Sequence, residues 1–349
     1  MPSGRVNTAQ GVMFWGYLGL GVAQSSETID AVPAVFQNGE FRVAFAFNNG
    51  ACRSFRGDGK LDLLVRSAET GALWVYPHSG KLNGTQTYED PVKIGDNFGR
   101  ERFCFIQACD VTGNGRAELC AFSVKEVTVN GEVRKINTGE NGVFGFFLLQ
   151  NLGGPGEIGP FGEPTRISGK REDDRYWSTF GFADITGSGN DDIFSRGLGA
   201  GNFDCFPHLN AGVIADDTYD REPLPLTTIN PDDFPFAMAD FTGNGNLDLL
   251  VRRPDGDIAL FEFPGKPGVE YADPASGTWY TVARGWQDMK YMTLTDVDLD
   301  GKPDLLALRP DGTLSAFVHS GRFDPDNPES LFSEPVTVGT GFDRYDTIS

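Results

Sequence analysis

Basic residues are scarce in this sequence. Its 349 residues include 29 lysines and arginines against 49 aspartates and glutamates, so the formal charge is −20 at pH 7. A charge of that sign repels phosphate backbones and anionic lipid surfaces alike. We therefore expect no nucleic-acid partner.

Cysteine is also sparse, with five residues at irregular spacing. They are Cys52, Cys104, Cys109, Cys120 and Cys205. This spacing matches neither a disulfide framework nor a metal-binding motif. A bond between Cys104 and Cys109 is one alternative, but we expect free, buried thiols.

Long hydrophobic runs are missing. An apolar stretch near the N-terminus, GVMFWGYLGLG from Gly11, is broken by glycines and follows a single basic residue, Arg5. Such a stretch is too short to span a membrane and is a poor secretion signal. We expect no membrane insertion. The compartment stays open: cytoplasmic as the chain is encoded, or secreted if a leader has been removed.

Glycine, proline and aromatic residues are abundant instead. The chain has 45 glycines, 21 prolines and 28 phenylalanines, and 39% of its residues are hydrophobic. A helical protein would not tolerate so many helix breakers, whereas aromatic residues suit the half-buried surfaces of sheets. We expect an all-β protein with a substantial core.

An acidic motif recurs five times along the chain. The copies are SFRGDGKLDLLVRSAETGAL from Ser54, DVTGNGRAELCAF from Asp110, DITGSGNDDIFSR from Asp184, DFTGNGNLDLLVRRPDGDI from Asp240 and DVDLDGKPDLLALRPDGTL from Asp296. Successive copies start 56, 74, 56 and 56 residues apart, and the long interval holds a polar insertion over residues 125–142. A fixed period with one loop insertion is typical of stacked supersecondary units.

A glycine and a second strand follow each motif, as in GALWVYPHSG from Gly71 and GTLSAFVHSG from Gly312. Apolar residues occupy both alternating faces of these strands, for example Leu73 and Tyr76, so each sheet should be buried on both sides. Antiparallel sheets of this kind at a fixed period indicate the blades of a β-propeller.

The two ends of the chain resemble parts of a further repeat. GVMFWGYLG from Gly11 resembles the second strand, and VGTGFDRYDTIS at the C-terminus resembles the stretch that runs into Asp296. We therefore expect one composite blade made from residues 1–53 and the C-terminal segment, which closes the ring without a free sheet edge. The fold predicted is a single domain over residues 1–349, a six-bladed propeller of four-stranded antiparallel blades, with seven blades as the alternative.

Together, the acidic motif, its glycine and the following aromatic strand resemble the FG-GAP/VCBS repeat of integrin α-chain propellers and of bacterial and fungal propellers, lectins included. The resemblance covers roughly residues 54 to 349. It implies a propeller fold. For function it implies several possibilities, because such propellers serve as adhesion modules, as sugar-binding lectins and as attachments to lyases or other enzymes.

The last acidic loop has the donor set that Ca²⁺ prefers. Oxygen ligands at alternate positions, with glycine where the chain turns sharply, can surround this cation with six to eight oxygens. The side-chain ligands expected here are Asp296, Asp298, Asp300 and Asp304. A backbone carbonyl near Lys302 would complete them.

The other loops keep only two acids each. Their candidate metal ligands are Asp240, Asn244 and Asp248; Asp184 and Asp192; and Asp110, Asn114 and Glu118. For these three loops we favour a metal-free turn, in which the first aspartate accepts backbone N–H groups. The copy from Ser54 has Arg56 inside the loop and is expected to bind no cation.

Histidine and arginine recur at fixed positions of the repeat. The three histidines, His78, His208 and His319, each follow the repeat glycine by seven residues. A structural role at the strand exit is favoured, and a ligand or metal site is the alternative. The arginines Arg66, Arg196 and Arg252 are expected to pair with a carboxylate of a neighbouring blade.

Tryptophan is the residue type on which a sugar ring most readily stacks. Trp279 and Trp286 lie at strand borders and are the favoured candidates, with Trp177 as a third. Trp15 and Trp74 lie within apolar strands, where core packing is expected.

These features favour a non-catalytic recognition propeller that binds carbohydrate between its blades. The alternatives are an enzyme, such as a lyase, dehydratase or cyclase that uses the central channel or top face, and a protein-binding scaffold. No nucleophile elbow, histidine-rich metal motif or phosphate loop is present in the sequence. Aromatic and polar pockets at blade borders would favour the lectin, whereas a deep polar channel would favour the enzyme. The sugar and the oligomeric state stay open.

Overall fold

The computed structural model describes residues 34–37, 40–43, 54–129, 132–137, 145–168, 177–197, 202–209, 214–219, 222–230, 232–265 and 276–349. The chain divides into two compact units, residues 1–47 and 48–349, and each is described by itself. In the first unit, β1 (Ala34–Gln37) and β2 (Glu40–Val43) form an antiparallel hairpin. No helix within the described ranges is long and apolar enough to cross a membrane.

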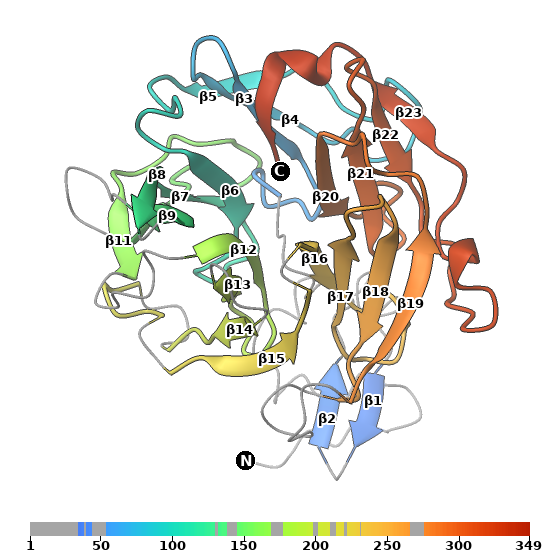
Figure 1. Cartoon of the computed structure of the whole chain (residues 1–349). Coiled ribbons are helices and arrows are strands. Elements are labelled where there is room, and N and C mark those ends of the chain that lie inside the picture. Colours follow the sequence, from blue (N-terminus) through green and yellow to red (C-terminus); the bar gives the residue numbers. More distant parts are fainter. Residues whose placement is uncertain are drawn as a thin grey trace, which may run out of the picture. The chain divides into compact units, whose positions relative to one another are not determined.

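In the second unit, the described residues form five four-stranded antiparallel sheets, the blades of a propeller (Figure 1). The first blade contains β24 (Tyr345–Ile348), β3 (Leu63–Ser67), β4 (Leu73–Tyr76) and β5 (Val92–Gly95). The second contains β6 (Phe105–Cys109), β7 (Glu118–Phe122), β10 (Phe146–Leu149) and β11 (Thr165–Ser168). The third contains β12 (Trp177–Ala183), β13 (Asp192–Gly197), β14 (Asn202–Phe206) and β15 (Leu224–Thr228).

The last two blades follow the same plan. The fourth contains β16 (Phe234–Ala239), β17 (Asp248–Arg252), β18 (Ile258–Glu262) and β19 (Thr278–Ala283). The fifth contains β20 (Tyr291–Thr295), β21 (Asp304–Leu308), β22 (Leu314–Phe317) and β23 (Val336–Gly339). The polar insertion forms a separate hairpin of β8 (Val124–Val129) and β9 (Glu132–Asn137). Two short 3-10 turns are η4 (Pro328–Ser330) and η5 (Phe342–Arg344).

The first strands of the five blades contact one another in succession. Contacts join β12 to β16, β16 to β20, β20 to β24 and β24 to β6. The rings of Phe105 in β6 and Phe180 in β12, whose centroids are 5.3 Å apart, link the remaining pair. The blades therefore form a closed ring.

The hydrophobic core lies between the blades. Each of five buried clusters combines side chains from two neighbouring blades, so every border in the ring is filled. In β10 and β22, which follow the repeat glycines Gly142 and Gly312, every residue is buried. Burial on both faces, predicted from the apolar residues at alternating positions, is thus confirmed for these strands.

The prediction of six blades, or seven, is wrong, because the described residues form five. The predicted composite blade is wrong as well. The C-terminal strand β24 pairs with β3, in the repeat from Ser54, and the backbones of Leu64 and Ser349 exchange two hydrogen bonds of 2.8 and 2.9 Å. Each repeat supplies three strands to one blade and the first strand of the next, so five repeats fill five blades. The prediction of one domain over residues 1–349 stays a prediction.

Arginines at one position of the repeat fasten the segments that join one blade to the next. Arg66, Arg196 and Arg252 each donate to the backbone carbonyl 37 residues further along the chain. These acceptors are Phe103, Asp233 and Met289 respectively. For Arg66 the predicted pairing with a neighbouring blade's carboxylate is wrong, because Arg66 pairs with Asp346 of β24 in its own blade.

The described cysteines are free thiols. Cys109, Cys120 and Cys205 are buried, and Cys104 is partly buried. Cys104 immediately precedes β6 and Cys109 ends the same short strand, so the alternative disulfide between them does not form. Cys52 lies outside the described residues.

Candidate functional site

The acidic loops are built as turns around their first residue. Asp240 accepts the backbone N–H groups of Gly243, Asn244 and Gly245 at 2.7 to 3.0 Å. The first aspartates Asp110, Asp184 and Asp296 accept turn N–H groups in the same way. In the copy from Ser54 the hydroxyl oxygen of Ser54 takes this role. The aspartate turn is therefore present in all four copies that begin with aspartate.

The acid eight residues after the start of each loop is buried and also accepts backbone N–H groups. Asp304 accepts the N–H of Val297 at 2.8 Å and that of His319 at 2.7 Å. Burial raises the pKa of Asp304 to about 7. The same position in other repeats is held by Asp62, Glu118, Asp192 and Asp248, all buried, and burial raises the pKa of each.

Three of the four predicted Ca²⁺ ligands in the last loop lie close together. One carboxylate oxygen from each of Asp296, Asp298 and Asp304 lies within 4.8 Å of the others. Burial, with the neighbouring acids Asp300 and Asp298, raises the pKa of Asp296 to about 6. Asp300 is engaged elsewhere, because its carboxylate forms a 2.7 Å ion pair with Lys302. Among the described residues, the three other acidic loops have no such group of three acids.

The histidines bind across blade borders. The Nε2 atom of His78 lies 2.9 Å from the Val297 carbonyl oxygen, and its Nδ1 accepts the N–H of Gly80. His319 repeats this arrangement with the Phe241 carbonyl. For His208, burial lowers the pKa and the nearby carbonyl of Val111 partly offsets that shift. All three rings are buried on different borders, so they do not converge on one site. Their assignment as ligand-binding residues stays a prediction, and the geometry favours the structural alternative.

His78 should make unfolding pH-dependent. Burial lowers its pKa, and its Nδ1 accepts a hydrogen bond that protonation would break. The neutral ring therefore stabilises the fold above pH ~6.5, its unfolded pKa, and this contribution is lost as the pH falls below that value. At pH 7.5 we expect His78→Phe to lower the free energy of unfolding by about 1 kcal/mol relative to the wild type. Phenylalanine matches Phe263, which is seven residues after Gly256.

Urea unfolding at pH 7.5 and pH 5.0 measures this difference. The account predicts that the gap between the two proteins narrows at pH 5.0. A gap that is the same at both values would show that the His78 ring carries no pH-dependent contact.

Two of the candidate tryptophans occupy different environments. Trp286 is only 5% exposed and packs on Phe317, with ring centroids 4.5 Å apart. The backbone N–H of Trp286 donates to the carbonyl of Gly256, whose φ of +88° only glycine adopts readily. The same contact joins Phe98 to Gly71 and Phe342 to Gly312. Trp286 therefore fills a core position of the repeat and offers little surface to a ligand.

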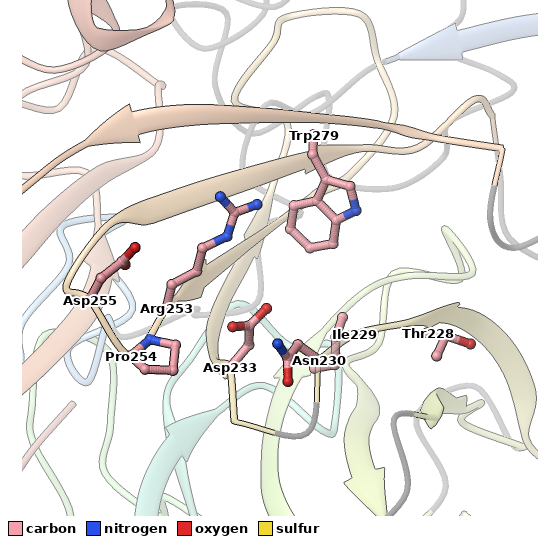
Figure 2. A pocket seen from close by; sticks show the side chains of 8 residues that line it. All are labelled: Thr228, Ile229, Asn230, Asp233, Arg253, Pro254, Asp255 and Trp279. Carbon is pink, nitrogen blue, oxygen red and sulfur yellow. The ribbon is translucent and has the colours of Figure 1, made fainter.

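Trp279 instead lines a pocket of about 570 Å³ between the third and fourth blades (Figure 2). Its indole packs on Phe261, with centroids 4.8 Å apart, and the Arg253 guanidinium lies 5.7 Å from the ring centroid. The pocket is lined by Thr228, Ile229, Asn230, Asp233, Arg253, Pro254, Asp255 and Trp279. Trp177 begins β12, where the structure describes only the backbone, and Trp15 lies outside the described residues.

Several lining residues of this pocket were not among the sequence candidates. Asn230 and Asp233 lie in the segment between β15 and β16, while Arg253 and Asp255 lie in the turn between β17 and β18. Burial raises the pKa of Asp233, and the nearby Arg253 partly offsets that rise. The sequence signal for this pocket was the clustered charge of Asp232, Asp233, Arg253 and Asp255. That signal was not sufficient, because the two segments meet only when the third and fourth blades pack side by side.

The pocket combines an aromatic face with hydrogen-bonding groups of both kinds. A pocket of this size accepts a small molecule, and its carboxylate, amide and guanidinium groups can accept and donate hydrogen bonds. Figure 2 shows the Arg253 guanidinium and the Trp279 indole side by side above Asp233 and Asn230. Such a lining suits a ligand with one apolar face and several hydroxyl groups.

Comparisons with known proteins address the fold. A model of the FG-GAP-like repeat family matches residues 240–307, which hold the last two acidic loops. One similar solved structure is described as the structural basis of specific recognition of non-reducing terminal N-acetylglucosamine by an Agrocybe aegerita lectin. It has 16% identity and a TM-score of 0.43, over 85% of this chain and 82% of that one. No curated protein sequence matches the chain. Residues 240–307 therefore match an FG-GAP-like repeat, and the described residues of the second unit form a five-bladed β-propeller.

Proposed function

We propose that this propeller is a non-catalytic carbohydrate-binding protein whose site is the pocket at Trp279. The observation that supports this most is the partly buried indole beside Asn230, Asp233 and Arg253 at a blade border. The C–H face of a pyranose stacks on an indole, while its hydroxyl groups exchange hydrogen bonds with carboxylate, amide and guanidinium groups.

The alternative functions have weaker support. An acid–base enzyme needs groups with perturbed pKa values in a cleft. The loop acids whose pKa values are raised, such as Asp304 and Asp192, use their oxygens to accept backbone N–H groups. The loop acids therefore give little support to a lyase, dehydratase or cyclase. Asp233, whose pKa burial also raises, lines the pocket and is assigned to ligand binding below. The size of the pocket favours a small sugar over a protein partner.

Removing the indole should weaken sugar binding. Trp279→Ala deletes the stacking surface, so we expect a loss of about 1 kcal/mol or more in binding free energy. A glycan array first identifies bound sugars. Calorimetric titration with methyl glycosides of glucose, galactose, mannose and N-acetylglucosamine then measures affinity.

Trp286→Phe is the matched control, because phenylalanine occupies the equivalent core positions of Phe98 and Phe342. It should bind sugars like the wild type. If no sugar binds to the wild type, or if Trp279→Ala binds as tightly as wild type, the proposed site is rejected.

We also propose Ca²⁺ as a structural ion of the last acidic loop. Asp296, Asp298 and Asp304 fit this cation, because three carboxylates converge there and hard oxygens are its preferred ligands. When bound, the ion would neutralise the crowded charge of the loop. Asp300 fits less well because Lys302 already pairs with it. The predicted ligands in the loops from Asp110, Asp184 and Asp240 stay predictions, with metal-free turns favoured.

Ca²⁺ should therefore stabilise the wild type against unfolding. At a free concentration 100 times its Kd, a ligand that binds only the folded state adds about 2.7 kcal/mol. Asp298→Thr copies the Thr242 position of the preceding loop and should remove most of this gain, whereas Asp300→Asn should remove less. Thermal unfolding with Ca²⁺ and with chelator measures it. Equal melting temperatures of the wild type under both conditions would exclude the ion.

A further inference from the structure

Asp233 occupies an unusual position at the border between the third and fourth blades. It immediately precedes β16 and is only 6% exposed. Its backbone carbonyl accepts a hydrogen bond from Arg196, but the structure describes no hydrogen bond or ion pair for its carboxylate. Figure 2 shows this carboxylate directed toward the space between the Arg253 guanidinium and the Trp279 indole. The carboxylate thus lines the pocket, where its oxygens are free to accept hydrogen bonds from a ligand.

The repeat supplies the comparison. Asp233 is the residue whose carbonyl accepts the hydrogen bond from the repeat arginine at the fourth blade. The equivalent acceptors are Phe103 at the second blade and Met289 at the fifth. Phe103 is fully buried and Met289 is 9% exposed, and both belong to hydrophobic clusters. The second and fifth blades therefore use this position for an apolar side chain that packs in the core. A carboxylate there serves the pocket and not the packing.

Trp279 departs from its repeat in the same way. It pairs with Phe261 across β18 and β19. In the fifth blade Ala316 pairs with Val336, which places Pro335 opposite Phe317, and in the first blade Val75 pairs with Val92, which places Pro91 opposite Tyr76. The aromatic residue and the unpartnered acid thus occur together, on two different segments that meet at one border.

The charges at this border select the kind of sugar. Asp233 and Asp255 line the pocket with two carboxylates, against the guanidinium of Arg253 over the indole. Near Asp233, Arg196 and Asp232 add one further charge of each sign. An anionic sugar would face two like charges on a chain of formal charge −20. A neutral sugar has hydroxyl groups that can donate to Asp233 and accept from Arg253.

We propose that Asp233 is a ligand-binding residue whose carboxylate accepts hydrogen bonds from neighbouring hydroxyl groups of a neutral sugar stacked on Trp279. This deepens the proposed function and rests on it. The pocket accordingly rejects sugars that carry a carboxylate.

Two substitutions at Asp233 test this by calorimetric titration with the neutral methyl glycosides named above. Asp233→Asn keeps the shape and should weaken the tightest of them at least tenfold. Asp233→Met copies Met289 and should abolish binding, while its melting temperature equals or exceeds that of wild type. A residue with a purely structural role would not lose binding and gain stability together. Asp311→Asn changes the fifth-blade residue that matches Asp255 and does not line this pocket, so it should bind like wild type.

The outcomes separate the two levels of the proposal. If Asp233→Asn binds within twofold of wild type while Trp279→Ala loses binding, the role of Asp233 is overturned and the proposed function stands. If glucuronate binds as tightly as the glucose glycoside, selection of a neutral sugar is overturned. If the wild type binds none of these sugars, both the role of Asp233 and the proposed function fail.

Discussion

Deletion of residues 345–349 should leave a chain that is largely unfolded or aggregated. The deletion removes β24, so β3 is left with an open edge. Tyr345 and Ile348 are 8% and 7% exposed, and burying side chains of this size contributes about 1.5–3 kcal/mol each. Their loss, with the loss of the Arg66 ion pair, approaches the whole stability of an ordinary domain, about 5–15 kcal/mol.

Soluble yield and the urea midpoint measure this effect, and a synthetic peptide provides the control. A peptide of residues 340–349, added in excess, should restore part of the lost structure by pairing with β3. A truncated chain that unfolds at the same urea concentration as the full chain would contradict closure of the ring by β24.

Asp346→Ala should have the second-largest effect on stability. The Asp346 carboxylate accepts hydrogen bonds from Arg66 at 2.7 Å and from Arg100 at 2.6 Å. Arg66 is fully buried, and removing the partner of a buried charge costs about 3–5 kcal/mol. The carbonyls of Phe98 and Phe103 still bind the guanidinium, so we expect about 3 kcal/mol, the lower end of that range.

Urea unfolding of two further variants isolates the buried charge. Arg100 is 61% exposed, so Arg100→Ala should cost no more than about 1 kcal/mol. Adding Arg66→Met to Asp346→Ala removes the orphaned charge and should recover part of the loss. If Asp346→Ala is as mild as Arg100→Ala, Arg66 does not depend on this carboxylate.

The sequence predicted the repeat unit but not the closure of the ring. The sequence likeness between the C-terminal segment and the stretch before Asp296 reflects equivalent strands, because β24 and β20 are each the first strand of a blade. The partner of β24 depends on a pairing between Leu64 and Ser349, which are far apart in sequence. A local pattern does not encode such a pairing, and the apolar stretch from Gly11 suggested a sixth repeat.

The candidate site was predictable only in part. Trp279 was proposed from its strand-border position, and the same reasoning proposed Trp286. Comparison of Trp286 with Phe98 and Phe342 in the repeat register would have placed it in the core. The clustered charge around Asp233 did not single this residue out, because its significance depends on the arginine contact that aligns it with Met289.

The central claim is that a sugar stacks on Trp279, and the indole N–H signals of the five tryptophans test it most directly. In ¹⁵N-labelled protein, a saturating neutral sugar should shift the indole signal of Trp279, assigned with Trp279→Phe, and leave those of Trp74 and Trp286 in place. A sugar that shifts the Trp286 signal and leaves that of Trp279 unchanged would contradict the account.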